Sequence, residues 1–397
     1  MWRSRPWPAP SCMPWSARTS RRAFPGCATW VPANPCRCWT SRSAGGRSGR
    51  LLAGCCQVPC LTVRTRSCAA FPKSRTTCFL LRFRPKEIPM RDPDELSGLQ
   101  GARVLITGAG GMLGSAFARH LAAHVPTAVV AALDRSAFDV RHREQAEALR
   151  AWRPDIVIHC AVCSDVNWCE DHPDEAAQVQ VLGSRHVAAL ARECEARFFF
   201  PQTFLVYDGS ETVDETTPAR PLSVYGRLKL EAEQMALQHA PDALVVRMGG
   251  FFGEQARDKN FVGKLIPHLA GMLCSGADRM EIGDRVWQPT LTDDLAYNGL
   301  LLLARGETGR FCMASHGQAS FFELASEIVR LLGLDGRIEI ARVAAETMAR
   351  KEKAMRPAAV VMRNAALQAR GLDRQRSWQD SLASYLAQPY FTTMFAP

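Results

Sequence analysis

Thr107-Gly108-Ala109-Gly110-Gly111-Met112-Leu113-Gly114 is the stretch that decides the fold of this 397-residue chain. It follows the apolar run RVLIT (Arg103–Thr107), which is typical of a buried strand, and precedes an Ala- and Leu-rich segment that predicts a helix to about His124. Glycine lacks a Cβ, so a glycine loop can turn tightly and approach a pyrophosphate at the N-terminus of the following helix. This order of elements predicts dinucleotide binding by Gly108, Gly110, Gly111, Met112, Leu113 and Gly114. The alternative is that the glycines serve only tight helix–strand packing.

The end of the next predicted strand carries charged residues of both signs. The strand covers residues 128–133 and is followed by Asp134 and Arg135. An acid here would bond the ribose 2′-hydroxyl of NAD, whereas an arginine would pair with the 2′-phosphate of NADP. We therefore expect NADP(H) or NAD(H), with Asp134, Arg135 and Asp139 among the cofactor contacts.

Strand and helix patterns alternate through the first part of the ordered chain. Apolar runs at residues 155–160, 197–200 and 243–248 alternate with predicted helices at 141–153, 173–195 and 225–238. Such continuous apolar strands indicate a parallel sheet that is covered on both faces. The prediction is an α/β fold: a Rossmann-type doubly wound parallel sheet over residues 100–250, and a smaller C-terminal substrate-binding lobe over residues 251–390.

A second motif, Tyr225-Gly-Arg-Leu-Lys229, opens the last of these helices. Residues i and i+4 share one helix face, so the phenol and the ammonium group point into the same space. A nearby cation favours phenolate and lowers a tyrosine pKa, as a general acid for a carbonyl requires. The alternative is a solvated surface pair.

These two motifs, in this order, resemble the extended short-chain dehydrogenase/reductase superfamily. Over roughly residues 102–388 the chain resembles more closely the dTDP-4-dehydrorhamnose reductase family. The segments that carry this resemblance are Thr203-Phe-Leu-Val-Tyr-Asp-Gly209, Arg153-Pro-Asp155, Asn260-Phe261-Val262, Pro289-Thr290 with Asp294-Leu-Ala296, and Arg356-Pro357.

The resemblance implies reduction of a 4-keto nucleotide sugar, dTDP-4-dehydrorhamnose, by NAD(P)H. It implies that Thr203 is the catalytic threonine, Tyr225 the proton donor and Lys229 the residue that holds the nicotinamide ribose. Cys160 and Ala161 match the segment beside the cofactor. The implied substrate contacts are Thr203, Phe204, Asn260, Trp287 and Pro289. A Mg²⁺ requirement does not follow from the sequence, and no metal ligands are predicted.

The chain departs from the family pattern at several positions near this site. Phe204 replaces the Asp that usually follows the threonine, Asn167 replaces an Asp, Gln180 replaces an Asn, and Trp287-Gln288 stands where a Gly is common. Phe204 and Leu205 offer no acid or base at the places where 4,6-dehydratases carry two carboxylates, so elimination is disfavoured. Two alternatives stay open: a regulatory subunit that resembles the methionine adenosyltransferase beta subunit, and another nucleotide-sugar reductase or epimerase.

Charge and composition divide the chain near residue 90. Residues 1–89 hold 16 of the 49 Lys and Arg and one acid, Glu87, whereas the remainder holds 33 basic against 38 acidic residues. The net charge of +10 therefore does not predict nucleic-acid binding by the folded part. No run of 18 apolar residues occurs, so no membrane span is predicted.

Residues 1–89 lack apolar periodicity and are predicted to be a disordered or non-native leader, with Met90 as the real start. Their Arg- and Ser-rich, acid-poor composition leaves a targeting segment as the alternative. Cys160 and Cys194 lie in apolar stretches and are expected to be reduced, which favours a cytoplasmic location. A nucleotide sugar is the expected small-molecule partner, and a homodimer is a further expectation.

Overall fold

The structure is a computed structural model that describes residues 93–209, 212–349 and 352–395. The leader predicted over residues 1–89 lies outside the described residues. A 3₁₀ helix at Pro93–Leu99 leads into the first strand.

Six parallel strands form the main sheet, in the spatial order β2-β1-β3-β4-β6-β11. Their bounds are β1 Arg103–Thr107, β2 Val129–Leu133, β3 Ile156–His159, β4 Arg197–Thr203, β6 Leu244–Met248 and β11 Gly309–Met313. The chain moves from β1 to one side of the sheet and then returns to place β3 on the other side of β1. Ligands of open α/β sheets bind outside the carboxyl ends of the strands at such a reversal. The predicted glycine loop follows β1 at this point.

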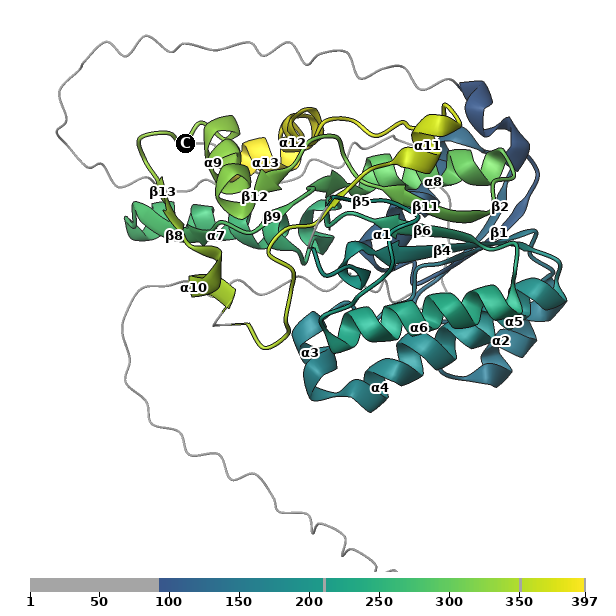
Figure 1. Ribbon diagram of the computed structural model, residues 1–397. Helices are drawn as coiled ribbons and strands as arrows, with labels where there is room; N and C mark the ends of the chain where they lie inside the picture. The colour runs from purple at the N-terminus through teal and green to yellow at the C-terminus, as the bar shows by residue number, and fades with distance from the viewer. Residues whose placement is uncertain (1–92, 210–211, 350–351, 396–397) are drawn as a thin grey trace, which may run out of the picture. The chain divides into compact units, whose positions relative to one another are not determined.

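Helices cover both faces of the sheet, as the fold prediction requires (Figure 1). One apolar cluster joins a sheet face to α1 (Met112–His124), α8 (Thr292–Ala304) and α11 (Ala365–Ala369). A second joins the opposite face to α2 (Arg143–Leu149), α5 (Ser184–Glu193) and α6 (Val224–His239). The three strands β1, β3 and β6 are buried at nearly every position, which explains their uninterrupted apolar sequences.

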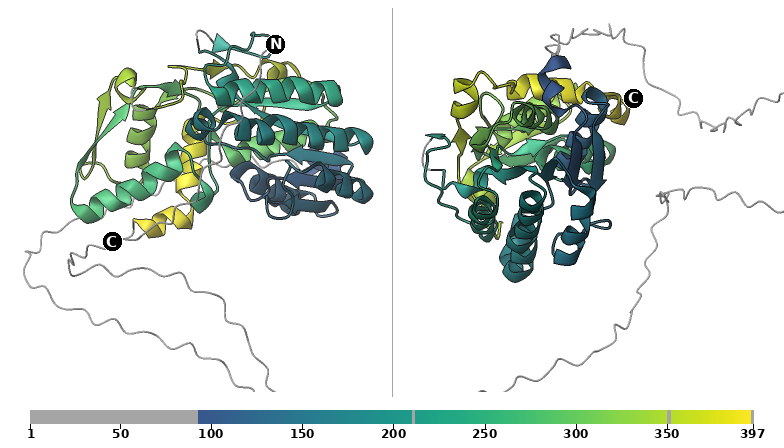
Figure 2. Two further views of the ribbon diagram at one scale, coloured as in Figure 1. Left: turned by 90° about the horizontal axis from the view of Figure 1, so that it is seen from below. Right: turned by 90° about the vertical axis from the view of Figure 1, so that its right-hand side faces the viewer.

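The residues beyond 250 build a third apolar cluster of their own and also return to the main sheet (Figure 2). The longest strand pair of this part is parallel and joins β8 (Arg279–Gly283) to β13 (Glu339–Val343). Its other elements are α7 Phe261–Ser275, β9 Val286–Trp287, β12 Ala319–Ser320, α9 Phe321–Leu331, α10 Ala345–Ala349, α12 Trp378–Leu386 and α13 Pro389–Met394. The predicted boundary near residue 250 stays a prediction, and α8 and β11 would belong with the first domain.

Short strands and helices lie between the two parts. The parallel pairs β5 (Thr212–Val213) with β14 (Val361–Met362) and β7 (Phe251–Phe252) with β10 (Thr290–Leu291) join distant segments of the chain. Residues 249–259 therefore contain the strand β7 and also a 3₁₀ turn, Gln255–Arg257.

The helix predicted over residues 173–195 is continuous from Pro173 to Glu193, but it contains a π-helical turn that the sequence did not predict. The structure has α3 (Val166–Asp171), α4 (Pro173–Ala177), a π-helical turn at Gln178–Gly183, and then α5. At Gly183 an added Cβ would lie 2.6 Å from the Val140 side chain. This close approach places the wider turn against the loop before α2. Likewise, the helix predicted over 141–153 ends as a 3₁₀ turn, Arg150–Trp152, with Arg153 in the left-handed region at φ 49°.

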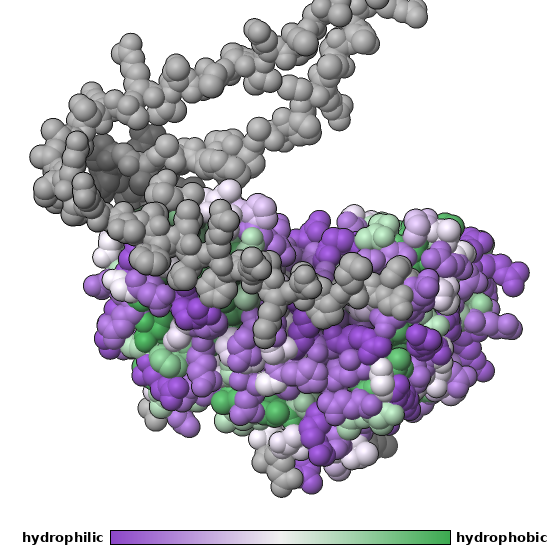
Figure 3. All heavy atoms as spheres, turned by 90° about the horizontal axis from the view of Figure 1, so that it is seen from above, coloured by the Kyte–Doolittle hydropathy of each residue, from purple (hydrophilic) through white to green (hydrophobic). Residues whose placement is uncertain are grey.

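The surface of the described part is mainly polar. Figure 3 shows a face on which hydrophilic residues surround scattered apolar ones. Among the described residues, the large apolar residues that count as exposed are Val129, Val162 and Met355. Within the same residues, each helix is too short or too polar to traverse a bilayer.

Candidate active site

The four glycines of the loop have different reasons to lack a side chain: packing requires two of them and leaves space at the other two. A Cβ on Gly108 would lie 2.6 Å from the Ala161 nitrogen, and a Cβ on Gly114 would lie 2.6 Å from the Gly108 carbonyl oxygen. Gly108 also has φ +67°, which L-residues rarely adopt. Gly110 and Gly111 are exposed, and an added Cβ on either would come no closer than 3.2 Å to its neighbours. Tight packing therefore explains Gly108 and Gly114, whereas Gly110 and Gly111 suit a ligand that approaches the backbone.

The N-terminus of α1 lies open next to these two glycines. Gly111 is the N-cap residue and supplies no side-chain cap to the first N–H groups of this 13-residue helix. Met112 and Leu113 begin the helix; Leu113 is buried in the core beneath it, and Met112 is half-buried. Uncapped N–H groups with the helix dipole behind them attract a phosphate group. The described residues therefore fit the pyrophosphate of a dinucleotide.

Charged side chains gather after β2, as the sequence predicted. Asp134 is exposed, and its Oδ1 accepts hydrogen bonds from the Ser136 hydroxyl (2.6 Å), the Ser136 amide (2.9 Å) and the Ala137 amide (3.1 Å). The hydrogen bond from the Ser136 hydroxyl is the main cause of its lowered pKa. Asp139 is held by Arg141 at 2.5 Å, which keeps its pKa well below the usual range. Arg135 is 76% exposed and lies 3.5 Å from Asp139, so this guanidinium is open to a further anion.

A relay of hydrogen bonds fixes the segment after β3. Thr107 Oγ1 accepts from the Ala161 amide (3.3 Å) and lies 2.7 Å from His159 Nδ1; His159 Nε2 lies 3.0 Å from Ser184 Oγ. The Ser184 hydroxyl donates to the Gln180 carbonyl, and burial lowers the pKa of His159 to about 3. The neutral imidazole therefore accepts from Thr107 and donates to Ser184.

This relay places Cys160 and Ala161 against Gly108 of the glycine loop, and their contact with a cofactor stays a prediction. Burial raises the pKa of the Cys160 thiol to about 12.

Tyr225, Lys229 and Thr203 converge where α6 meets the end of β4. Ser223 caps α6 by accepting from the Gly226 amide (3.1 Å), and a Cβ on Gly226 would lie 2.4 Å from the Leu205 carbonyl oxygen. The glycine after Tyr225 thus lets the helix pack directly on the turn that follows Thr203. Burial raises the pKa of Tyr225, and a hydrogen bond with the Thr203 side chain opposes part of this rise.

Lys229 is 5% exposed and donates from Nζ to the Pro201 carbonyl at 3.1 Å. Its Nζ also lies 4.9 Å from the centre of the Phe200 ring. Burial lowers the pKa of Lys229 to about 8, although Glu233 one turn along the helix favours the charged form. In this structure the amine is directed to Pro201, and the pKa of Tyr225 is raised by burial instead of being lowered by Lys229 as predicted.

The predicted substrate residues occupy different environments. Trp287 is 6% exposed and stacks on Phe321 with ring centres 5.0 Å apart, so it is a core residue of the second part. Its ring also borders Gly250, where a Cβ would lie 2.3 Å from Trp287 Cε3 and 3.3 Å from Phe204 Cε1. Phe204 is half-buried and packs in the same cluster as Tyr225. Two aromatic rings therefore meet at Gly250, close to the tyrosine.

Asn260 and Pro289 have structural contacts. Asn260 donates from Nδ2 to the Phe251 carbonyl (2.7 Å), and Nδ2 lies 3.7 Å from Met112 Sδ, which joins the second part to the glycine loop. The buried Pro289 accepts from the Ser315 hydroxyl at 2.6 Å. Their role toward a substrate stays a prediction.

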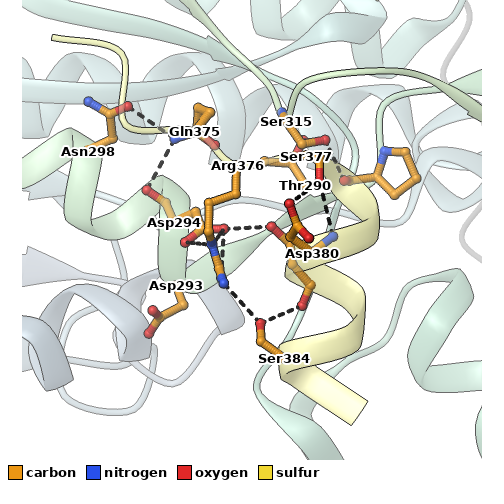
Figure 4. Close-up of polar contacts among 12 residues, drawn as sticks. Thr290, Asp293, Asp294, Asn298, Ser315, Gln375, Arg376, Ser377, Asp380 and Ser384 are labelled. Atoms are coloured by element: carbon orange, nitrogen blue, oxygen red, sulfur yellow. Dashed lines mark hydrogen bonds and ion pairs between the residues drawn. The ribbon is translucent and has the colours of Figure 1, made fainter. Parts of the chain in front are cut away.

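The Pro289-Thr290 and Asp294 motif takes part in two groups of buried polar contacts that the sequence did not predict (Figure 4): Ser315 bonds to Pro289, and Arg376 bonds to Asp294. Asp294 is 3% exposed and accepts from Arg376 Nε (3.0 Å) and the Ser381 hydroxyl (2.8 Å). Gln375 donates to the Asp294 carbonyl, and Arg376 donates to the Ser384 hydroxyl. These bonds hold α12 against α8, so Asp294 has a structural role.

Several contacts of residues near the site were also not predicted. Glu170 Oε1 accepts from the Val224 amide at 2.8 Å, which ties the loop after β3 to the residue before Tyr225. Asn167, which replaces the usual Asp, accepts from the Ala354 amide (3.2 Å) and Arg356 (3.4 Å). These contacts join residues that lie 54 or more positions apart, which no local pattern reveals. The described residues contain no group of three or more His, Cys, Asp or Glu that could hold a metal ion.

Comparison with known proteins decides the family. The model of the RmlD substrate binding domain matches residues 102–391, nearly all of the described chain. The chain belongs to this family. The predicted resemblance to dTDP-4-dehydrorhamnose reductases is thereby confirmed.

Relatives of this RmlD-family chain include proteins that are named as sugar reductases. A dTDP-4-dehydrorhamnose reductase of Mycobacterium tuberculosis is 32% identical over 304 residues, covering 73% of this chain and 94% of the relative. A dTDP-4-keto-6-deoxy-D-glucose reductase of Streptomyces niveus is 31% identical over 288 residues, covering 70% and 95%.

Solved structures show the same fold. A Clostridium acetobutylicum dTDP-4-dehydrorhamnose reductase superposes with a TM-score of 0.66 at 30% identity, covering 72% of this chain and 98% of that one. A Bacillus anthracis dTDP-4-dehydrorhamnose reductase in complex with NADP has a TM-score of 0.66 at 24% identity, covering 72% and 99%. The predicted Rossmann-type α/β fold is confirmed.

Proposed function

We propose that this protein is an oxidoreductase that reduces the 4-keto group of a nucleotide sugar with NAD(P)H, converting dTDP-4-dehydrorhamnose to dTDP-rhamnose. The observation that carries the proposal is the convergence of Tyr225, Thr203 and Lys229 on one buried site, at the same edge of the sheet as the glycine loop. The named activities of the Mycobacterium and Streptomyces relatives support the substrate class.

The cofactor would lie with its pyrophosphate on Gly110, Gly111 and the start of α1, and its adenosine ribose at Asp134 and Arg135. When bound, the nicotinamide supplies the hydride that adds to C4 of the sugar. The exposed Arg135 and the NADP-bound Bacillus relative support NADP(H), whereas Asp134 supports NAD(H). A Mg²⁺ requirement is not part of the proposal.

The residues of this chain would supply the proton. As hydride reaches C4, the carbonyl oxygen gains charge, and the Tyr225 phenol gives its proton to that oxygen. The raised pKa of Tyr225 keeps the phenol protonated at neutral pH, so the donor is ready before each turnover. Thr203, which hydrogen-bonds to Tyr225, would hold the same oxygen and orient the phenol.

The aromatic residues Phe204 and Trp287 favour a second candidate function. Phe204 stands where the family usually has Asp, and its ring meets Trp287 at Gly250. These two rings at Gly250 favour one of two alternatives. The substrate is a nucleotide sugar other than dTDP-4-dehydrorhamnose, or the protein is a regulatory subunit that binds the cofactor without turnover, like the methionine adenosyltransferase beta subunit.

Turnover with defined substrates distinguishes these functions. The purified protein is mixed with NADPH and dTDP-4-dehydrorhamnose, with the UDP- and GDP-linked 4-keto-6-deoxy sugars as comparisons. The proposal predicts loss of reduced-nicotinamide absorbance and a dTDP-linked product with a new 4-hydroxyl group, seen by mass spectrometry. NADPH binding without turnover on all three sugars would contradict the proposal and favour the regulatory subunit.

A homodimer and a cytoplasmic location are further proposals. Sedimentation equilibrium of the purified protein measures the first, and microscopy of a tagged chain in its own cells measures the second. A monomer, or a location outside the cytoplasm, would contradict them.

A further inference from the structure

Two thiols face each other beside the proposed catalytic tyrosine. Cys163 lies in the loop after β3 and Cys169 in α3, and their sulfur atoms are 3.9 Å apart. Both are free thiols. A disulfide bond has a length of about 2.05 Å, so the sulfurs must approach by about 2 Å to form one.

The thiol pair packs directly on the proposed site. Cys169 is completely buried in the apolar cluster that contains Leu205 and Tyr225, and Cys163 and Phe204 pack against the same cluster. The neighbouring Glu170 accepts from the Val224 amide at the start of α6. A movement of either sulfur is thus transmitted to Tyr225 by packing and through the end of its helix.

The two thiols differ in the way that a reactive and a resolving cysteine differ. Cys163 is half-buried between the exposed Val162 and Ser164, so a small oxidant can reach it, whereas Cys169 is 0% exposed. The Cys169 thiol donates to Cys163 Sγ, and this hydrogen bond lowers the pKa of Cys163 to about 7. The thiolate is the nucleophilic form of cysteine, and redox-sensitive cysteines are accessible and lie next to a partner thiol.

We propose that Cys163 and Cys169 form a reversible disulfide when hydrogen peroxide or another hydroperoxide reaches the loop, and that this bond arrests turnover at Tyr225. The inhibition rests on the proposed function; formation of the bond does not.

The chemistry balances in two steps. The Cys163 thiolate attacks one peroxide oxygen, an S–O bond forms, the O–O bond breaks, and the leaving hydroxide takes a proton to become water. The Cys169 sulfur then attacks the sulfur of the Cys163 sulfenic acid, the S–S bond forms, and hydroxide leaves with the Cys169 proton as a second water. Two thiols lose two electrons in total, and a dithiol reductant reverses the change.

Packing and electrostatics predict opposite effects of the disulfide on turnover, so the direction of the change in rate shows which effect dominates. Thiolate charge at Cys163 contributes to the raised pKa of Tyr225, and a disulfide would remove that charge. Electrostatics alone would therefore make Tyr225 a stronger acid and raise the rate. In a close-packed cluster, however, a covalent shift of about 2 Å displaces neighbouring side chains, and we expect this displacement to dominate.

Peptide analysis tests the bond itself. Cleavage before aspartates separates residues 155–164, which contain Cys160 and Cys163, from residues 165–170, which contain Cys169. After peroxide treatment of the full chain and blocking of free thiols, the two peptides should be joined and should separate on reduction. Cys163→Ser should abolish the joined pair, whereas Cys274→Ser, which removes an exposed thiol elsewhere, should leave it. Separate peptides in the peroxide-treated wild type would overturn the proposal.

Turnover tests the arrest. Each variant is compared with its own untreated sample, so a change in basal rate does not matter. Wild type and Cys274→Ser should lose at least about tenfold in kcat and regain it with dithiothreitol, since displacing a general acid costs about 10²–10⁴-fold. Cys163→Ser should keep its untreated rate. A joined peptide pair with unchanged or higher turnover would overturn the arrest. If the untreated wild type shows no turnover, the proposed function fails. The effect of the disulfide is then measured as NADPH binding, followed by fluorescence. Loss of NADPH binding after peroxide treatment would support an effect of the disulfide on the site, and unchanged binding would overturn it.

Discussion

At the residue scale, Lys229 shows how burial changes the protonation of a side chain in the proposed site. Its amine has left bulk water, so the charged form is disfavoured, while the Pro201 carbonyl accepts one of its hydrogen bonds. The Tyr225–Lys229 spacing was readable in the sequence because i and i+4 share a helix face. The partner of Lys229 was not readable, because Pro201 lies 28 residues away on β4.

The pKa of Lys229 predicts the alkaline limit of activity. With a pKa of about 8, the amine is charged below that pH and neutral above it, so its hold on the nicotinamide ribose weakens as pH rises. We expect kcat/KM for NADPH to fall above about pH 8, since kcat/KM reports the free enzyme. Lys229→Met should lower kcat/KM and remove this limb of the profile. An unchanged limb in Lys229→Met would contradict the assignment.

Asp134 makes a second prediction at the residue scale. Its carboxylate is charged and exposed next to Gly110, where it would repel the 2′-phosphate of NADP. Asp134→Ala should raise the ratio of kcat/KM for NADPH over NADH. Ser136→Ala, which removes only a hydrogen bond to Asp134, is the control and should change the ratio less. If Asp134→Ala leaves the ratio unchanged, Asp134 does not lie at the ribose.

At the scale of elements, the sequence predicted what depends on local pattern. The strand at Arg103–Thr107 and the helix ending at His124 agree with the structure, because the apolar run and the glycines that follow it determine them locally. The π-helical turn at Gln178–Gly183 was missed, because it depends on the close approach of Val140 at Gly183. The role of Asp294 was missed for the same reason, since Arg376 lies 82 residues away.

The pair of Asp294 and Arg376 predicts stability. Arg376→Met leaves a buried carboxylate with its Ser381 bond but without its guanidinium partner, which costs about 3–5 kcal/mol of the free energy of unfolding. Glu339→Gln breaks the exposed pair with Arg279 and should cost no more than about 1 kcal/mol. Chemical denaturation followed by circular dichroism measures both. Equal effects would show that this pair does not hold α12 to α8.

At the scale of the whole molecule, the charge division near residue 90 matches the extent of the family. The family match begins at residue 102, and the described residues begin at 93, so each feature assigned to the site lies beyond the basic segment. A chain that begins at Met90 should keep the denaturation midpoint and the kcat/KM of the full chain. Loss of folded protein or of turnover in the shorter chain would contradict the predicted leader.

The reductase account depends most directly on the transferable proton of Tyr225. Tyr225→Phe keeps the ring and its packing and removes only the hydroxyl, so NADPH and dTDP-sugar affinity should persist. Turnover of dTDP-4-dehydrorhamnose should fall about 10²–10⁴-fold, the usual contribution of a general acid. Tyr390→Phe, a tyrosine of α13 outside the proposed site, is the matched control and should keep the wild-type rate. The decisive measurement is kcat of Tyr225→Phe beside Tyr390→Phe at saturating substrates: collapse in the first alone is the predicted result, and equal rates in both would contradict the proposed mechanism.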